Sequence, residues 1–213
     1  MSEQVLRKSG AVQKNRSKVR TIAQVAMLGA VATVLMLFEF PLPFLAPPFY
    51  ELDFSEVPVL IGAFAMGPVA GIAIEAVKIL LNFVFNGTIT AGVGEIANFL
   101  FGCAFLLPAS LIYRKKKTRK HAVLGMAAGT ITMTIAACII NAWVLLPAYG
   151  IAFGMPVEAF VEMGTAIHGA INSLFRFALL VVGPFNLLKG TLVSGIVLLL
   201  YKRIRVILRG DYS

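Results

Sequence analysis

Asn186 and Lys189 are the residues of this sequence that are hardest to explain by packing alone. They are three positions apart, so they share one face of the apolar helix predicted from Gly183-Pro184 onward. An amide and an amine in such a helix cost free energy unless each meets a polar partner or a water-lined cavity. Two interpretations follow. Either Asn186 caps the helix while Lys189 reaches the membrane interface, or both bind the polar edge of a ligand.

Other polar side chains lie near the outer ends of predicted apolar helices. Asn98 and Asn141 are costly in lipid and are expected to face the protein interior. Glu95 precedes Asn98 by one turn and either favours the helix N-terminus electrostatically or faces a pocket. Together with Asn186 and Lys189 they can converge on one outward-facing cavity. Amides both donate and accept hydrogen bonds, so such a cavity suits a flat ligand with an alternating polar edge, as in a flavin.

A second polar group lies on one face of a predicted helix, at Glu75, Lys78 and Asn82. We expect a structural ion pair between Glu75 and Lys78, with direct ligand contact as the alternative. No metal site is predicted. His168 lacks a metal partner at suitable spacing and is expected to form hydrogen bonds instead.

Composition limits the class of protein. Of 213 residues, 59% are hydrophobic and 14% are charged, which indicates an integral membrane protein. The net charge of +9 does not indicate nucleic-acid binding, because the basic residues cluster at 7–20, 114–120 and 202–209, between or outside the apolar runs. No phosphate-binding loop motif is present, so no nucleotide site is predicted.

The predicted fold class is an all-α integral membrane protein, a six-helix transmembrane bundle with a ligand pocket near the extracellular face. The helices are expected at 21–38, 57–66, 68–85, 93–113, 122–146 and 183–201. The second is short, and Gly67-Pro68 separates it from the third. The expected domains are a flexible basic cytoplasmic N-terminus (1–18), the membrane domain (19–205) and a cytoplasmic C-terminal tail (206–213).

Two long segments connect predicted helices and are expected to be structured themselves. Segment 39–56 contains four prolines and several aromatic residues, so it is expected to fold onto the bundle as a lid. Segment 148–182 is expected to form helical pieces on the outer side that do not cross the membrane. Within it, His168, Asn172 and Arg176 are expected to form a polar stripe along one helix face.

Three alanines form a stripe on the first predicted helix, at Ala23, Ala26 and Ala30. Small residues spaced three and four apart let another helix approach closely. The sequence leaves open whether that helix belongs to this chain or to a partner protein.

Four stretches carry a resemblance to a known family: Leu52-Asp53-Phe54-Ser55-Glu56-Val57-Pro58, Gly92-Val93-Gly94-Glu95-Ile96-Ala97-Asn98-Phe99, Leu145-Leu146-Pro147-Ala148-Tyr149 and Pro184-Phe185-Asn186-Leu187-Leu188-Lys189-Gly190. In these, and over about residues 18–205, the chain resembles the riboflavin-specific substrate-binding subunits (S components) of energy-coupling-factor (ECF) vitamin transporters. The family has six helices and binds its ligand near the outer face, under the loop that follows the first helix.

The resemblance implies that Asn141, Asn186 and Lys189 bind the polar edge of riboflavin, and that the loop around Leu45, Phe49 and Tyr50 covers it. Riboflavin is then a transported ligand and not a cofactor; flavin mononucleotide is a further candidate. The resemblance also implies that Ala26 and Ala30 dock on a membrane coupling subunit, with two ATPase subunits driving uptake across a bacterial cell membrane and both termini cytoplasmic.

Two alternatives remain at this stage. A related S component binds another vitamin, such as thiamine or pantothenate. A membrane-embedded enzyme would use Glu75 or His168 as acid or base.

Overall fold

The computed structural model describes residues 2–88 and 90–209 of the chain. Nine α-helices occur in this part: α1 Ser2–Met36, α2 Glu56–Met66, α3 Pro68–Asn86, α4 Val93–Lys115, α5 Arg119–Ile140, α6 Leu146–Phe153, α7 Val157–Ile167, α8 Leu174–Phe177 and α9 Gly183–Arg209. Two π-helical segments, Asn141–Leu145 and Ala178–Val182, join α5 to α6 and α8 to α9. Two short strands, β1 Phe40–Pro41 and β2 Glu51–Leu52, pair antiparallel.

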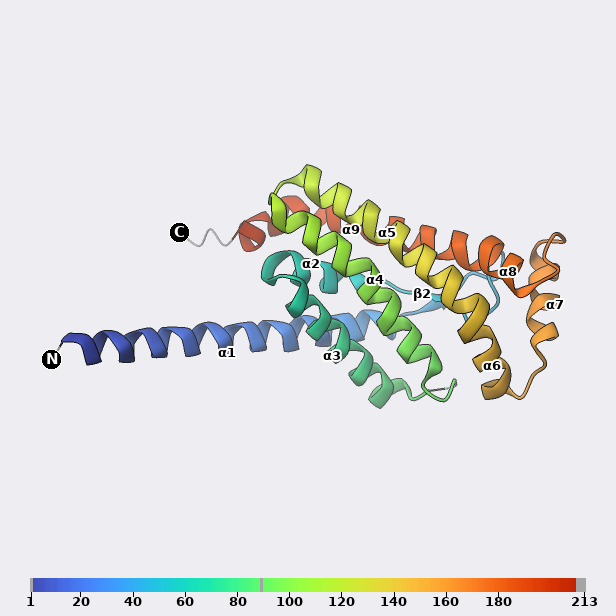
Figure 1. The fold of residues 1–213 in the computed structure, drawn as a ribbon, viewed down its shortest axis with the longest axis horizontal. Helices are drawn as coiled ribbons and strands as arrows, with labels where there is room; N and C mark the ends of the chain where they lie inside the picture. The colour runs from blue at the N-terminus through green and yellow to red at the C-terminus, as the bar shows by residue number, and fades with distance from the viewer. Residues whose placement is uncertain (1, 89, 210–213) are drawn as a thin grey trace.

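The bundle has two distinct ends. The beginning of α1, the end of α9 and the α4–α5 connection lie at one end, and β1, β2, α6, α7 and α8 gather at the other (Figure 1). Five helical stretches in the described chain are long and apolar enough to cross a membrane: 18–36, 68–86, 93–115, 119–153 and 174–201. The helix α2 is shorter and also apolar.

The predicted break between the second and third helices is confirmed. Gly67 has φ +101°, a conformation that favours glycine, and its N–H donates to the carbonyl of Ala63 as α2 ends. Pro68 then occupies the first turn of α3, where a missing N–H costs nothing. The chain therefore reverses within one residue, and α2 packs directly against α3.

The first and last helices extend beyond their predicted limits. Helix α1 begins at Ser2 and α9 continues to Arg209, so each carries a basic segment that the sequence assigns to a terminal tail. Residues 210–213 of the predicted C-terminal tail lie outside the described part of the chain.

The prediction for segment 148–182 is wrong in part. Helix α6 continues the fifth span through Asn141–Leu145, and Leu174–Val182 begins the last span instead of lying beside it. Wider π-helical turns carry the backbone past Pro147 and Pro184, where an α-helix would lose hydrogen bonds. Asn186 and Lys189 therefore lie inside the last span and not at its start.

The predicted polar stripe of His168, Asn172 and Arg176 is also wrong. Helix α7 ends at Ile167 and α8 begins at Leu174, so these three residues do not share a helix face. A turn follows α6, where Gly154 adopts φ +63°.

Two hydrophobic cores hold the bundle together. The first is near the end where α1 begins and includes Phe64, Phe105 and Tyr113. The second joins the loop after α1 to α6, α7 and the start of the last span, and includes Leu52 and Phe160. Each buried large side chain contributes on the order of 1.5–3 kcal/mol relative to exposure in water, with a smaller gain where lipid is the alternative surrounding. The second core fixes the loop whose position decides the shape of the site.

Candidate functional site

A cavity of about 410 Å³ opens between the loop after α1 and helices α3, α4 and α9. This volume lies in the range of small-molecule pockets. Seven of the eight residues that the sequence predicts to bind ligand line it: Glu95, Asn98, Asn141, Asn186, Lys189, Phe49 and Tyr50. They come from four separate parts of the chain, which only the fold brings together. Leu45 does not line the cavity; it packs against the second core.

The predicted lid is folded onto the bundle through aromatic contacts. The ring of Phe49 lies 5.8 Å from the rings of Tyr149 and Phe160, both edge-on. The ring of Tyr50 lies 5.7 Å from that of Phe185 on α9. Pairing of β1 with β2 closes the base of the loop. An aromatic wall therefore covers one side of the cavity.

Asn141 is fully buried and faces the interior, as predicted. Its side-chain N–H donates to the carbonyl of Ala137 at 2.8 Å, in its own helix. Its Oδ1 accepts a hydrogen bond of 2.6 Å from the hydroxyl of Tyr50. This bond joins the lid directly to the fifth span. Burial raises the pKa of Tyr50 well above its usual value, so its hydroxyl remains a donor.

Lys189 makes an ion pair that is not evident from the sequence. Its ammonium nitrogen lies 2.7 Å from Oδ2 of Asp53. Asp53 belongs to the loop after α1 and is only 1% exposed. Oδ1 of Asp53 accepts the N–H of Ser55. Burial by itself raises the pKa of Asp53, but Lys189, Lys78 and the Ser55 bond outweigh it and lower the pKa to about 2. Asp53 therefore fixes the ammonium at the cavity wall.

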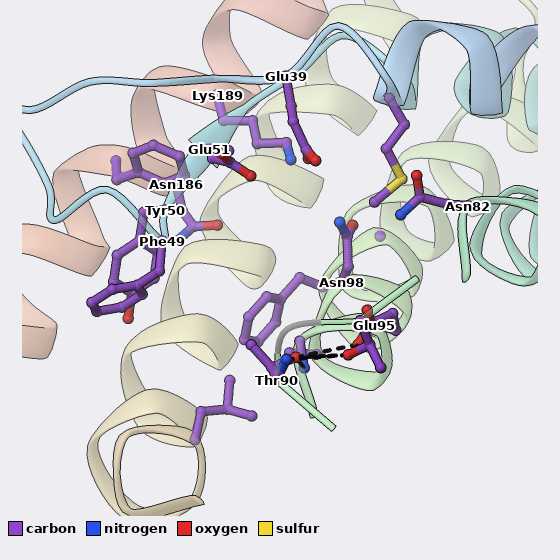
Figure 2. Close-up of a pocket in the computed structure, with 18 of the residues that line it drawn as sticks. Glu39, Phe49, Tyr50, Glu51, Asn82, Thr90, Glu95, Asn98, Asn186 and Lys189 are labelled. Atoms are coloured by element: carbon purple, nitrogen blue, oxygen red, sulfur yellow. Dashed lines mark hydrogen bonds between the residues drawn. The ribbon is translucent and has the colours of Figure 1, made fainter. Parts of the chain in front are cut away.

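Asn186 presents its amide to the cavity beside Lys189 (Figure 2). Its N–H donates to the carbonyl of Val182 at 2.9 Å, which orients the Oδ1 atom away from the helix axis. The amide oxygen and the ammonium group thus form a short polar edge with both an acceptor and a donor.

Two glutamates of the lid lie close to this edge. Glu39 and Glu51 line the cavity near Lys189 (Figure 2). Burial, followed by the charges of Glu51 and Asp53, raises the pKa of Glu39 to about 7 although Lys189 opposes the shift. Glu39 also accepts a hydrogen bond of 3.2 Å from Asn86 at the end of α3.

Glu95 and Asn98 lie on the opposite side of the cavity (Figure 2). Glu95 accepts hydrogen bonds from the hydroxyls of Thr88 and Thr90, at 3.1 and 3.3 Å. These bonds tie the α3–α4 connection to the first turn of α4. Glu95 therefore has a structural role besides lining the cavity.

The predicted ion pair of Glu75 and Lys78 is confirmed and is larger than expected. The Lys78 nitrogen lies 2.7 Å from Glu75 and 2.8 Å from Glu56, and all three side chains are almost completely buried. Gly102 makes room for this group, since a Cβ atom there would collide with the Glu75 carboxylate. Because Glu56 and Gly102 also line the cavity, the ion group forms part of its wall.

The remaining predicted residues lie away from the cavity. Ala23, Ala26 and Ala30 are exposed on the outer face of α1, whereas neighbouring Gly29 is buried against Val77 of α3. The internal packing seam therefore runs through Gly29 and not through the alanines. His168 accepts a hydrogen bond from the N–H of Ala170 at 3.3 Å.

Several cavity residues are absent from the sequence-based site. The most informative are Glu56, Asn82, Tyr149 and Phe185, and Asp53 is a further one that reaches the site through its ion pair with Lys189. Charged residues in an otherwise apolar loop were the available signal for Asp53 and Glu56. Nothing in the spacing of Tyr149 or Phe185 distinguishes them from ordinary core residues.

Comparisons with known proteins agree with one another. The family described as "ECF transporter, substrate-specific component" matches residues 20–201. The chain is 39% identical to "Riboflavin transporter RibU" of Staphylococcus aureus (strain TCH60), over 92% of this chain and 96% of that protein. It is 34% identical to "Riboflavin transporter FmnP" of Bacillus subtilis (strain 168), over 88% and 93% of the two chains.

A solved structure gives the same result. It is described as "Structure and mechanism of the S component of a bacterial ECF transporter" and matches with a TM-score of 0.70 and 39% identity, over 90% of this chain and 99% of that one. With its spanning helices, the chain is a multi-pass membrane protein and a component of a transporter, not an enzyme. It belongs to the substrate-specific component family of ECF transporters.

Proposed function

We propose that this chain captures riboflavin in the cavity beneath the lid and delivers it to an ATP-driven coupling complex. The observation that carries the proposal is the convergence of Asn141, Asn186 and Lys189 on one cavity. Relatives that share a third or more of the sequence are named riboflavin transporters.

The geometry fits the flavin ring system. Along the pyrimidine edge of a flavin, carbonyl oxygens alternate with ring nitrogens. One of these nitrogens carries a hydrogen and can donate a hydrogen bond. Lys189 donates to a carbonyl, and the Asn186 amide oxygen accepts from the ring N–H. Phe49, Tyr149 and Phe185 supply flat apolar surface for the fused rings. Leu45 acts in this arrangement by holding the loop in place.

The topology proposed for the membrane has six spans, with α2 as the short one. Helix α2 returns the chain to the end at which α3 begins (Figure 1). Basic residues at 7–20 and 114–120 then lie on the same side, which the positive-inside rule assigns to the cytoplasm. Both termini are cytoplasmic in this topology, and the cavity opens toward the extracellular face.

The coupling subunit docks on the exposed alanine stripe of α1. Ala23, Ala26 and Ala30 offer a surface on which a second helix can approach to van der Waals contact. Two ATPase subunits complete the complex in this proposal and supply the energy for uptake.

Flavin mononucleotide is the weaker ligand of the two flavins. The cavity wall contains four carboxylates, Glu39, Glu51, Glu56 and Glu95, and one ammonium group that is already paired. A phosphate with nearly two negative charges meets net repulsion there.

Purification of the full chain alone in detergent tests the function. The proposal expects a yellow protein with a flavin absorbance spectrum, whose extracted ligand is riboflavin by chromatography. Stripped protein should regain the spectrum on addition of riboflavin and not of thiamine or pantothenate. A colourless protein that binds one of those vitamins would overturn it.

A further inference from the structure

The buried ion group contains one more carboxyl group than it has cations. Glu56 is 2% exposed, and Glu75 and Lys78 are 0% exposed. Glu75 and Lys78 also lie near the middle of the candidate span 68–86. With both carboxyl groups ionised, the group would carry a net negative charge inside a membrane-spanning bundle, where an uncompensated charge is costly.

The described side chains around the group do not balance this charge. Asp53, from the loop after α1, is itself negative and is already paired with Lys189. Cys103 is the neighbouring titratable side chain on α4, and a thiol adds no positive charge. From α1, the hydroxyl of Thr33 lies 3.4 Å from the carbonyl oxygen of Lys78 and is uncharged. The excess charge must therefore be removed within the group.

A proton is the ligand that fits this imbalance. The Lys78 nitrogen lies 2.7 Å from Glu75 and 2.8 Å from Glu56, so a metal cation would be placed beside an existing positive charge. Among the described residues, no cluster of three or more metal-ligating side chains occurs. A proton needs only one oxygen atom and removes the excess charge by forming an O–H bond.

The hydrogen bonds of the group favour Glu75 as the protonated residue. Lys78 donates a hydrogen bond of 2.8 Å to Oε1 of Glu56, which stabilises the ionised form of that carboxylate. Neither oxygen of Glu75 has a hydrogen-bond partner in the described chain, although the Lys78 nitrogen is close to one of them. Burial without hydrogen bonds disfavours an ionised carboxylate, so the proton belongs on Glu75.

We propose that Glu75 is a proton-binding site, and that the pair of Glu56 and Glu75 holds one proton, carried by Glu75, at neutral pH. The group then contains one negative and one positive charge and is neutral overall. A neutral carboxyl group still has acceptor oxygens, so its contact with Lys78 is retained. The site does not depend on which ligand occupies the cavity, and failure to bind riboflavin would leave it intact.

Infrared spectroscopy of the full purified chain tests the site, because the C=O stretch of a protonated carboxyl group is separate from the bands of carboxylates and amides. Spectra are recorded at neutral pH, after removal of flavin, in a detergent without carbonyl groups. Glu75→Gln should lose one protonated-carboxyl band, since glutamine has nearly the size of neutral glutamic acid and carries no carboxyl group. Retention of every such band in this variant would overturn the proposal.

Two matched variants identify the band. Glu39 has a pKa raised to about 7, so it is partly protonated at neutral pH and contributes a band of its own. Glu39→Gln should lose that band and keep the one assigned to Glu75. Glu158→Gln should lose neither, because Glu158 is exposed on α7. Loss of the same band in Glu39→Gln and Glu75→Gln would overturn the assignment to Glu75.

The Glu39→Gln chain also supplies a measurement that does not depend on the folding of a Glu75 variant. At neutral pH it should still show a protonated-carboxyl band, and this band should shift on transfer to D2O, unlike the carbonyl band of a lipid ester. Absence of the band would overturn the proposal. Loss of the band on addition of sodium to a sodium-free buffer would also overturn it, because a metal cation would then be the ligand of the group.

Discussion

The ammonium nitrogen of Lys189 and the carboxylate of Asp53 lie 2.7 Å apart although the residues are 136 positions apart in sequence. One belongs to the last span and the other to the loop that covers the cavity. The pair therefore joins the lid to the helix that holds the ligand edge, and the carboxylate determines where the lysine donors point.

Asp53→Asn should weaken riboflavin binding by about 1.5–3 kcal/mol, because a charged hydrogen bond that positions Lys189 is lost. Titration of the purified variant measures this. Lys189→Met should cost a similar amount, and the double variant should cost much less than the sum. Glu158→Gln is the control, since Glu158 is exposed on α7. Full additivity of the two changes would show that Asp53 and Lys189 act independently.

Asn186→Ala should weaken riboflavin binding by about 1–3 kcal/mol, because a buried polar group of the ligand is left without its partner. The fold should persist, since the lost internal bond is one amide contact to the carbonyl of Val182. Calorimetric titration and a thermal unfolding scan check the two statements separately. An affinity equal to that of the unmodified chain would remove Asn186 from the site.

Ala30→Trp should abolish uptake and co-purification with the coupling subunit while the isolated chain still binds flavin. Ala30 is exposed on the outer face of α1, away from the cavity. A tryptophan side chain there should therefore prevent a partner helix from approaching without changing the ligand pocket. Leu80→Trp is the control, because Leu80 is 66% exposed on α3 and is already a large side chain. Normal uptake by Ala30→Trp would place the docking surface elsewhere.

Lys78→Met should destabilise the fold by about 3–5 kcal/mol, because it leaves the buried carboxylates of Glu56 and Glu75 without their cation. Unfolding in a denaturing detergent monitored by circular dichroism measures the loss. Neutralising the whole group with Glu56→Gln, Glu75→Gln and Lys78→Met together should recover much of the stability. If the triple variant is less stable than Lys78→Met, the charge imbalance is not the cause.

The thermal stability of the ligand-free chain should fall as the pH rises from about 5 to about 8. Glu39 has a pKa raised to about 7 from the ordinary 4.5, so between these values the folded state binds more protons than the unfolded state. The groups that face it are Glu51, Asp53 and Lys189. Thermal midpoints of the unmodified chain and of Glu39→Gln should diverge across this interval. Parallel pH profiles would show that Glu39 does not cause the change.

Much of the fold could be predicted because a membrane protein displays its organisation in its apolar runs. Five candidate spans occupy the predicted positions, and Gly67-Pro68 divides α2 from α3 as expected. The predicted helix boundaries are wrong where the backbone departs from the α-helix. No side-chain pattern distinguishes the π-helical segments Asn141–Leu145 and Ala178–Val182 from the helices around them. From the sequence, Pro147 therefore predicts a helix end and Pro184 a helix start.

The site was predictable where a polar side chain is costly in lipid. Asn98, Asn141 and Asn186 had to face the interior, and all three line the cavity. The pairing of Lys189 with Asp53 was not predictable, because it depends on how a proline-rich loop folds back over the bundle. Local sequence does not specify contacts across such a distance.

The π-helical segment Asn141–Leu145 makes the shape of the cavity wall depend on the number of residues in this helix. A π-helical turn results from one extra residue in an α-helix, so this part of the wall depends on chain length as well as on side-chain identity. Deleting one residue after Asn141 would remove the wide turn and restore the α-helix, and the helix beyond would keep nearly the same orientation. Tyr149 would then stay at the cavity, whereas the wall at Asn141–Leu145 would change. A deletion here therefore alters the cavity wall locally without replacing any of the side chains on the rest of the wall.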